Sequence, residues 1–478
     1  MKFFYTLSLL ITPFIAISQN CHCDSLFLET RQLVEENYAG WFDKVSPKNK
    51  AAYQNWTQQK YLKSKAVKTD STCAKLLKEW IGFFKDKHLR ILYSQPLKAS
   101  TPQQRNDTPI QIIKYSLTEA SAQDYFKTAT TLDPIEGIYS NANYKLAIIK
   151  AKPNLFYAVI LSSQNENWTV GEVKLTIEKK GAAYLGTFYA GDKTETSTHT
   201  VSLVDNVLDF DIVFFEKLSP YSGTKRDLTE YEISKDKDAP SLQFKNDLAI
   251  WTFPTFYSNS EEQTAFLLEK YKNKLAETPY WIIDLRNNAG GDYRVGWQLF
   301  PYIYSKPVVK YYGEMRLSKQ NIELWFNSFI KNYYDQADDK TKKEIDDELA
   351  VMRSQIGKMY NGRNKATDTL QLAKILPNPK KIAILINENT ISSGELFTML
   401  AQQSDKVVVM GANSGGMMDY GNVLRYKTTY PTIRIQIPID RMLWLNTGFS
   451  VDKAGLSPQL KFKNGDWIEQ AIQYLKMN

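Results

Sequence analysis

The amino-acid sequence predicts an α/β protein that has a helical subdomain at its N-terminus and a β-rich insert in its middle. Three observations predict this organisation. Apolar residues recur at three- and four-residue spacing up to about residue 100, short alternating segments follow, and strands then alternate with helices to the end of the chain. These patterns are typical of amphipathic helices, half-buried strands and an α/β core. A chain of 478 residues is long enough for two or three such domains.

The N-terminal segment, residues 1–18, has the features of a secretory signal peptide. Lys2 supplies a positive charge, and an apolar stretch runs from Phe3 to Ile17 and ends among small residues. Because such segments are removed on export, we expect cleavage near Ser18 and an exported protein, either periplasmic or secreted. Asn20 is too large and polar for the residue before a lipid-attached cysteine. No later segment approaches the length of a membrane span, so we expect no membrane-spanning segment.

The composition indicates a globular protein and gives no sign of nucleic-acid binding. Aromatic residues make up 13% of the chain and hydrophobic residues 43%, which is typical of a globular protein and not of a disordered one. The net charge of +8 is a mild excess over this length, and the chain has no dense run of Lys and Arg with interleaved aromatic residues. Binding to nucleic acid is therefore not expected.

The chain has only three cysteines, Cys21, Cys23 and Cys73. In an exported protein Cys73 can form a disulfide with Cys21 or with Cys23, which would tie the N-terminus to a nearby helix and leave one cysteine over. The run Cys21-His22-Cys23 is too crowded to arrange three ligands around one ion. We therefore predict no metal site.

Residues 19–100 form the predicted helical subdomain. Its apolar residues at helical spacing are Leu26, Leu33, Val34, Leu76, Leu77, Trp80, Ile81 and Phe84. His88 follows the last of these helical patterns, in the run Phe83-Phe84-Lys85-Asp86-Lys87-His88-Leu89-Arg90.

Residues 105–235 form the predicted β-rich insert, a barrel or a sandwich. Turn residues separate six short alternating segments, namely 144–149, 156–161, 168–177, 183–189, 198–204 and 207–214. A structural insert and a ligand-binding domain are both consistent with this pattern.

Residues 240–478 form the predicted α/β core. Its strand candidates are 248–253, 281–285, 382–386, 407–410 and 433–437, and its helix candidates are 260–275, 296–304 and 395–403. A polar, highly charged stretch from 318 to 365 interrupts the core, and we expect it to be a solvated helical excursion.

Two motifs follow apolar strands of this core. After residues 382–386, the segment Asn387–Glu395 places Ser392 and Ser393 where a buried strand turns into a helix. Such a turn exposes a hydroxyl nucleophile, and the helix start offers unpaired N–H groups to a developing oxyanion. After residues 281–283, the segment Asp284–Asp292 contains two glycines that let the backbone turn with its N–H groups free. Taken singly, the serine motif also fits an ordinary helix cap and the glycine motif an ordinary tight turn.

Together the two motifs resemble those of the C-terminal processing (tail-specific) and tricorn-like serine peptidases, within the ClpP/crotonase-like superfamily. The matching runs are Asp-Leu-Arg-Asn-Asn-Ala-Gly-Gly at 284–291, Asn-Glu-Asn-Thr-Ile-Ser-Ser-Gly-Glu at 387–395 and the glycine loop at 411–416. The resemblance covers about residues 240–478 and a patch near His88. It implies a crotonase-like spiral core that cleaves a peptide or protein substrate without a cofactor.

The resemblance also implies the roles of individual residues. Ser392 aligns with the nucleophile, Ser393 supplies one oxyanion N–H, and Gly290 or Gly291 supplies the other. One branch of the family activates its serine with a lysine in the glycine loop, where this chain has Met417.

The tricorn-like branch uses a histidine from the N-terminal region and an acid near the C-terminus. His88 takes the place of that base and Asp452 the place of that acid, although Gln459 stands where an aspartate is usual. We therefore predict a Ser392–His88–Asp452 arrangement.

Two other functions are compatible with the sequence. The first is a catalytically inactive protein that binds a peptide, glycan or lipid on the same scaffold, because the loop lysine is missing. The second is an α/β enzyme that uses the glycine loop for acyl-thioester chemistry, which the signal peptide disfavours. Residues 95–240 contain no Gly-Leu-Gly-Phe-like loop of a PDZ domain, so specificity for C-terminal tails is not carried over. The oligomeric state is left open.

Overall fold

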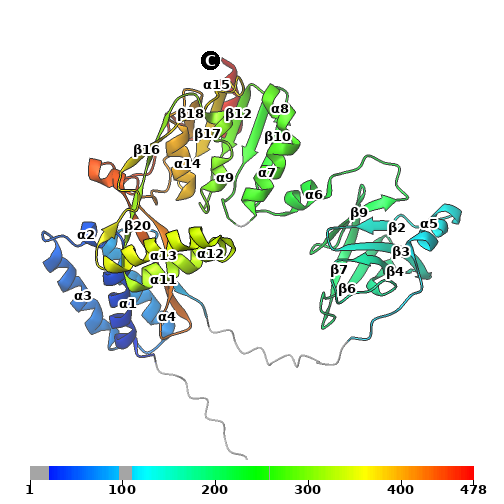
Figure 1. The fold of residues 1–478 in the computed structure, drawn as a ribbon, viewed down its shortest axis with the longest axis horizontal. Helices are drawn as coiled ribbons and strands as arrows, with labels where there is room; N and C mark the ends of the chain where they lie inside the picture. The colour runs from blue at the N-terminus through cyan, green and yellow to red at the C-terminus, as the bar shows by residue number, and fades with distance from the viewer. Residues whose placement is uncertain (1–20, 96–109, 258, 478) are drawn as a thin grey trace, which may run out of the picture. The chain divides into compact units, whose positions relative to one another are not determined.

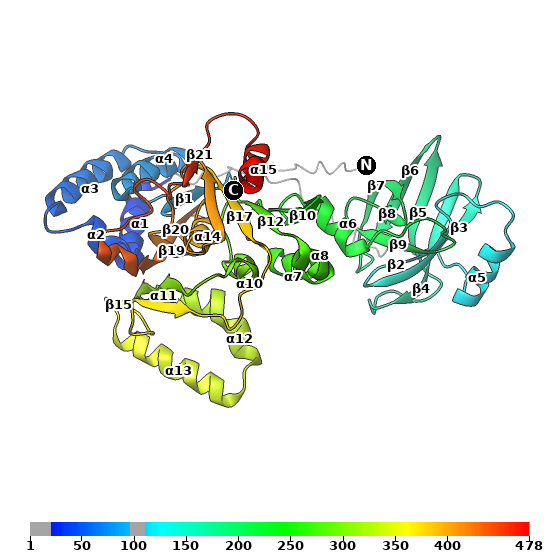
Figure 2. The same cartoon turned by 90° about the horizontal axis from the view of Figure 1, so that it is seen from above.

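The computed structural model describes residues 21–95, 110–257 and 259–477. It shows a mixed α/β protein whose chain divides into two compact units (Figures 1 and 2). Residues 1–97 and 285–478 form the first unit, and residues 98–284 form the second. The predicted signal peptide lies outside the described residues.

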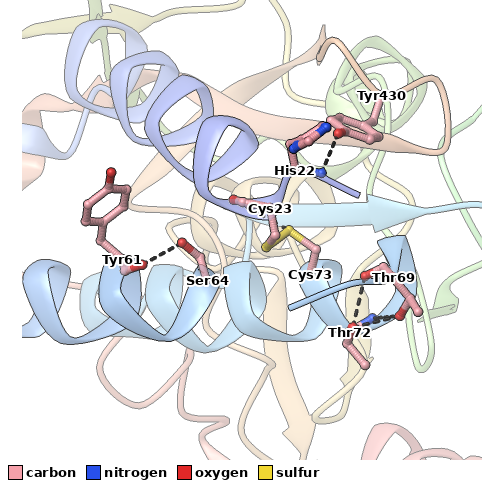
Figure 3. Close-up of a disulfide and its surroundings, with 8 residues drawn as sticks. All are labelled: His22, Cys23, Tyr61, Ser64, Thr69, Thr72, Cys73 and Tyr430. Carbon is pink, nitrogen blue, oxygen red and sulfur yellow. Dashed lines mark hydrogen bonds between the residues drawn. A yellow bond between two sulfur atoms is a disulfide. The ribbon is translucent and has the colours of Figure 1, made fainter. Parts of the chain in front are cut away.

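Four helices open the first unit: α1 (Cys23–Asn37), α2 (Trp41–Lys44), α3 (Lys50–Ser64) and α4 (Asp70–Ile81). The residues predicted at helical spacing pack between them, and Leu26, Val34, Leu77 and Trp80 are fully buried. A disulfide joins Cys23 to Cys73 and so links α1 to α4 (Figure 3). Cys21 keeps a free, buried thiol. Of the two pairings that the sequence allowed, the structure contains the one with Cys23.

The helical region leads directly into a sheet. A 3-10 turn (Gly82–Phe84) follows α4, Lys85 takes a left-handed conformation with φ 50°, and β1 (Arg90–Tyr93) begins two residues after His88. β1 pairs antiparallel with β20 (Ile433–Met442), which also pairs with β19 (Tyr420–Lys427) and with β14 (Gly313–Arg316). β14 pairs in turn with β15 (Met359–Tyr360). One hydrophobic core joins this sheet to the N-terminal helices, and Phe84 and Leu89, on the two sides of His88 in the chain, belong to it.

A second set of strands in this unit is parallel. β17 (Lys381–Ile386) pairs with β18 (Val407–Gly411), which pairs with β21 (Leu460–Lys461). Five of the six residues of β17 are buried, which is why the segment reads as a continuous apolar run. The helices of this region are α9 (Arg294–Trp297), α10 (Phe300–Ile303), α14 (Ser393–Ala401) and α15 (Trp467–Met477). β13 (Val308–Tyr311) and β16 (Thr367–Leu370) pair antiparallel as a separate two-stranded sheet.

The charged stretch from 318 to 365 is helical. It contains α11 (Lys319–Trp325), a π-helical turn (Phe326–Ile330), α12 (Lys331–Gln336) and α13 (Asp339–Ser354). The Ser318 and Asp338 side chains cap α11 and α13 by accepting the N–H groups of Asn321 and Thr341. α13 exposes most of its charged residues, as an excursion in contact with solvent should.

The second unit contains a closed eight-stranded barrel, which decides between the barrel and the sandwich that the sequence left open. Its strands are β2 (Gly137–Ser140), β3 (Tyr144–Lys152), β4 (Leu155–Ser163), β5 (Val173–Lys180), β6 (Ala183–Tyr189), β7 (Thr196–Val204), β8 (Val207–Asp209) and β9 (Phe214–Ser219). Each pairs antiparallel with the next, and β2 closes on β9. α5 (Glu119–Thr128) precedes the barrel and α6 (Leu228–Lys235) follows it.

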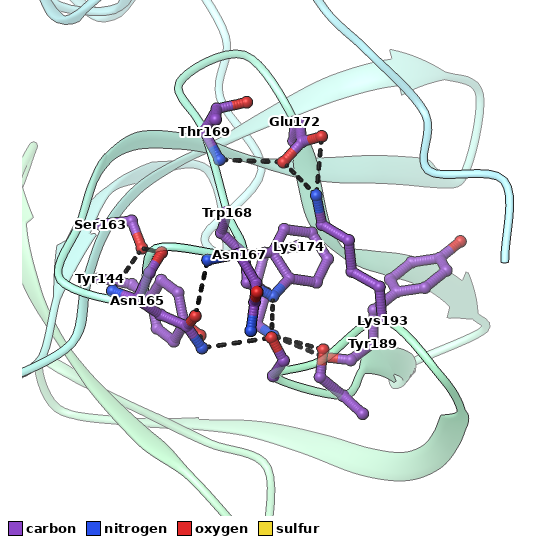
Figure 4. A network of polar contacts seen from close by, with 12 residues as sticks. Tyr144, Ser163, Asn165, Asn167, Trp168, Thr169, Glu172, Lys174, Tyr189 and Lys193 are labelled. Carbon is purple, nitrogen blue, oxygen red and sulfur yellow. Dashed lines mark hydrogen bonds and ion pairs between the residues drawn. The ribbon is translucent and has the colours of Figure 1, made fainter. Parts of the chain in front are cut away.

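Side chains fill the inside of the barrel, and one of them is a lysine. Phe156, Leu175 and Phe215 are among the fully buried members of this cluster. Lys174 is also fully buried, and its ammonium donates to the carbonyl groups of residues 189 and 190 and lies 4.0 Å from the centre of the Trp168 ring (Figure 4). Burial lowers the pKa of Lys174 to about 8.

The rest of the second unit is α/β. β10 (Ser241–Lys245) pairs antiparallel with β11 (Leu248–Thr252), which pairs parallel with β12 (Tyr280–Asp284). α7 (Ser260–Lys270) and α8 (Lys272–Glu277) connect β11 to β12, as a parallel crossover requires. In the part of the chain that the structure describes, no helix is both long enough and apolar enough to cross a membrane.

Candidate active site

The turn after β17 is closed by its own side chains. The Thr390 N–H donates to the Asn387 carbonyl at 2.9 Å, and the Asn387 N–H donates to the Thr390 hydroxyl at 3.0 Å. The same hydroxyl donates to the carbonyl of Leu285 at 2.7 Å. This buried threonine therefore ties the serine motif to the start of the glycine motif, which lies about a hundred residues earlier in the chain.

Ser392 lies between this turn and α14, in a backbone conformation that L-residues rarely adopt. Its φ is 56° and its ψ is −122°, and its side chain is partly exposed. Residues held in such a conformation cost about 1–3 kcal/mol and cluster at functional sites. The N–H groups of the first turn of α14 have no intrahelical acceptors, so they place positive potential beside the Ser392 hydroxyl.

The glycine motif packs directly against Ser392. The Ile391 N–H donates to the Asn288 carbonyl at 3.0 Å. A Cβ atom added to Gly290 would lie 2.7 Å from the Cβ of Ser392 and 3.2 Å from its hydroxyl oxygen. Gly290 has φ +77°, so both its missing side chain and its backbone conformation require glycine. The two motifs that the sequence singled out thus meet at one point.

One of the predicted oxyanion donors, the Gly290 N–H, is already hydrogen-bonded within the site. The Gly290 N–H donates to the side-chain oxygen of Asn288 at 3.0 Å, and the Ser393 hydroxyl donates to the Gly291 carbonyl at 2.6 Å. Before it can bind an oxyanion, the Gly290 N–H has to leave Asn288. Ser393 is the first residue of α14, so its N–H has no acceptor within the helix.

Glu395 organises the loop opposite α14. It is fully buried, and its carboxylate accepts the Ser392 N–H at 3.0 Å. It also accepts the Ser414 hydroxyl and the N–H groups of Gly416 and Met417, at 2.5, 2.7 and 2.8 Å. Burial raises the pKa of Glu395 above its usual value, although these hydrogen bonds act in the opposite direction. The role of Glu395 was not predicted from the sequence, although its spacing of three residues from Ser392 is that of a capping box.

His88 is buried and held in one orientation. Its Nδ1 lies 2.6 Å from the Tyr420 carbonyl oxygen, so that atom carries the proton and Nε2 has the free lone pair. Its backbone N–H donates to the Asp86 carboxylate at 2.8 Å. Burial lowers the pKa of His88, while the Asp86 charge and the bond to Tyr420 act in the opposite direction. The ring is thus neutral at neutral pH and able to accept a proton.

Asp452 does not occupy the position that the sequence predicted. It was expected at the far nitrogen of the His88 ring, but the Tyr420 carbonyl takes that place. The Asp452 carboxylate instead accepts the N–H groups of Met418 and Asp419, at 2.7 and 3.0 Å. These N–H groups lie just before Tyr420 in the chain, so Asp452 holds the backbone that leads to the carbonyl bound to His88. Burial raises the pKa of Asp452 to about 7.

Residues 414–420 form one loop that connects these groups, because Glu395 holds its beginning and the Tyr420 carbonyl holds His88 at its end. Met417, at the place of the loop lysine, is buried. A lysine nevertheless reaches this loop, since the Lys87 ammonium donates to the Gly415 carbonyl. Sequence reasoning missed Lys87 because it looked for a lysine close to Ser392 in the chain.

One cluster in the described residues has the composition of a metal site. The sulfur atoms of Cys21, Cys23 and Cys73 lie within 4.8 Å of one another. Two of them form the disulfide and offer no thiolate, so the cluster does not fit a metal ion in this state.

Comparisons with known proteins are consistent with this site. The model of peptidase family S41 matches residues 247–462, which include the glycine and serine motifs. No curated protein matches the chain.

Several solved structures are similar over most of the chain, with low identity and low TM-scores. Mature CPAF in complex with lactacystin has 13% identity and a TM-score of 0.42, with 95% of this chain and 97% of that chain covered. A putative peptidase from Parabacteroides merdae has 10% identity and a TM-score of 0.43, with 96% of each chain covered. The photosystem II D1 C-terminal processing protease has 11% identity and a TM-score of 0.36, with 93% and 94% covered.

Proposed function

We propose that this chain is a serine peptidase of family S41, whose model matches residues 247–462, with Ser392 as its nucleophile and His88 as its general base. The observation that carries the proposal is the strained Ser392 at the start of α14 with Gly290 packed against it. We further propose that residues 240–478 adopt the crotonase-like spiral of this superfamily and that the enzyme cuts within peptide chains, as an endopeptidase.

We propose that these groups act in the following steps. The Nε2 atom of His88 takes the proton of the Ser392 hydroxyl as the oxygen attacks the carbonyl carbon of the scissile bond. The Ser393 N–H and a glycine N–H released from Asn288 stabilise the resulting oxyanion. Nε2 then returns the proton to the leaving amine, and water hydrolyses the acyl-enzyme by the same steps.

The Tyr420 carbonyl takes over one task of an orienting acid, because it fixes the tautomer and the direction of the His88 ring. A carbonyl carries no full charge, so it stabilises the imidazolium less than a carboxylate would. Asp86, whose charge raises the pKa of His88, supplies part of that stabilisation. Asp452 is a positioning residue that holds residues 418 and 419.

A fluorophosphonate that reacts with activated serines tests the proposal directly. We expect a stoichiometric adduct on the peptide that contains Ser392, no adduct in Ser392→Ala, and strongly reduced labelling in His88→Ala. Ser354→Ala and His199→Ala, at positions outside the site, serve as controls for loss of a serine and of a histidine. Normal labelling of His88→Ala would exclude His88 as the base.

A second function is favoured by one observation. The Gly290 N–H is engaged by Asn288, as expected of a site that no longer stabilises an oxyanion. On this alternative the protein binds a peptide, glycan or lipid on an inactive scaffold. Absence of any adduct in the folded wild-type protein, together with absence of peptide cleavage, would support it.

We also propose that the protein acts outside the cytoplasm. The signal-like residues 1–18 and the Cys23–Cys73 disulfide support export, since such bonds persist in oxidising compartments. N-terminal sequencing of the protein from cell fractions tests this. A cytoplasmic protein that retains residue 1 would contradict it.

A further inference from the structure

Two exposed cationic side chains lie against the loop that packs on the segment before Ser392. Lys87 donates to the Gly415 carbonyl, and Arg90 lies with one guanidinium nitrogen 3.7 Å from the sulfur of Met417. The two charges thus lie beside residues 415 and 417 of one loop.

This loop is in direct contact with the segment that ends in the nucleophile. The Gly415 N–H donates to the Thr390 carbonyl at 2.9 Å, and a Cβ atom added to Gly415 would lie 2.4 Å from the Ile391 side chain. The Met417 N–H is bound to Glu395 in the first turn of α14. A substrate residue next to the scissile bond therefore passes close to these cations.

The acidic groups of the same region are arranged differently. Asp86 and Glu395 are buried, and each accepts hydrogen bonds from several neighbours. Burial raises the pKa of Asp452 to about 7, and its side chain is held by the N–H groups of Met418 and Asp419. Glu388 is the exposed acid on this segment, and its carbonyl oxygen would lie 2.7 Å from a Cβ atom on Gly415. Of these residues the exposed ones are the cations Lys87 and Arg90 and the acid Glu388, so the exposed charge beside the loop is positive.

We propose that the peptidase selects substrates with a carboxylate near the scissile bond and that Lys87 and Arg90 bind it. The proposal rests on the function proposed above and adds the substrate class to it. Lys87 has two ammonium hydrogens left after its bond to Gly415, and Arg90 keeps donors besides the one that binds the Lys87 carbonyl. An enzyme that cuts within peptide chains meets this carboxylate as an acidic side chain. A free C-terminus presents the same group to these donors, so the test separates the two.

Matched fluorogenic peptides distinguish the two sources. The first pair has an amidated C-terminus and differs only in Glu or Gln beside the scissile bond. The second pair is neutral in its side chains and has a free or an amidated C-terminus. We expect wild-type kcat/KM to favour the carboxylate by about tenfold or more in the first pair, as a hydrogen-bonded charge would give. The preference should shrink in 0.5 M salt, about three times the physiological ionic strength.

Charge changes at Lys87 supply the second arm. In Lys87→Gln the ratio within the pair should fall several-fold, because general damage to the enzyme cancels in a ratio. Lys87→Glu should reverse it in favour of a Lys-containing peptide, which a merely structural lysine would not do. Lys340→Gln, on the exposed surface of α13, should keep the wild-type ratio.

Two results would overturn the proposal in different ways. Ser392-dependent cleavage with no preference in the first pair, with a preference in the second pair alone, or with a preference that Lys87→Glu does not change refutes the substrate class and leaves the peptidase assignment in place. No cleavage of any peptide and no fluorophosphonate adduct refutes both.

Discussion

Replacing Gly290 by alanine tests the contact on which the candidate site depends. The new Cβ atom would lie 2.7 Å from the Cβ of Ser392 and 3.1 Å from the Ile391 carbonyl oxygen. Since non-bonded carbons sit about 3.5–4.0 Å apart, the serine has to move by about 0.8 Å or more. A displacement of about 1 Å in a catalytic group costs about a hundredfold in rate.

The substitution also strains the backbone, and this effect can be separated from the contact. At φ +77° an alanine costs about 1–2 kcal/mol of folding free energy. Gly181→Ala provides the matched control, because Gly181 has φ +64° and a Cβ atom there would meet nothing within 4 Å. It carries the same kind of strain without touching Ser392.

The assay combines urea unfolding with the rate of fluorophosphonate labelling at Ser392. We expect both variants to lose about 1–2 kcal/mol of stability, but only Gly290→Ala to lose about a hundredfold in labelling rate. If Gly290→Ala labels within about threefold of wild type while unfolding like Gly181→Ala, the packing of the two motifs at one reactive serine is wrong.

Three further predictions concern protons and cross-links. Because burial lowers the pKa of His88, kcat/KM should rise with pH through an apparent pKa below about 6.5, and Asp86→Asn should move it lower still; a midpoint above 7 would contradict a buried imidazole base. The raised Asp452 pKa of about 7 means that its contribution to stability is complete below about pH 4 and is lost as the pH rises to 7. Asp452→Asn should therefore match wild type in unfolding free energy near pH 4 and exceed it above pH 7. Its activity should fall by less than about tenfold, whereas a loss of about 10⁴ would show that the acid contacts His88 directly. Cys73→Ser opens a cross-link between residues 50 apart and should cost about 4 kcal/mol, whereas Cys21→Ser should cost far less; equal losses would place the disulfide on Cys21.

The local parts of the site could be predicted well from sequence. An apolar strand followed by polar turn residues, serines and a new apolar period specifies a strand-to-helix turn, and the structure has β17 and α14 on the two sides of Ser392. The paired glycines likewise indicated a backbone conformation that only glycine accepts easily, and Gly290 and Gly291 have φ of +77° and +132°. In the β-rich region the alternating segments identified strands, but a period of two is the same in a barrel and in a sandwich.

The partners of His88 were predicted less well. The sequence places a carboxylate at 452 and a carbonyl at 420 with equal ease, and it contains no information on which one meets the Nδ1 atom. Backbone carbonyls have no signature in a sequence, because every residue has one. Lys87 was missed for a similar reason, since it reaches Gly415 across 328 positions of the chain.

The sequence by itself indicated most of the strands and helices that flank the site, the positions that require glycine, and the serine at the start of a helix. These follow from the periodicity of side chains and the φ/ψ preferences of single residues, which act over a few positions. Only the tertiary structure decided which of the two cysteines bonds Cys73, that Gly290 touches Ser392, that Tyr420 and not Asp452 holds His88, and that Lys87 lies at the glycine loop. Those contacts join residues about 50 to 330 positions apart, and their distances are set by how the helices and sheets pack, to a few tenths of an ångström that no local pattern encodes.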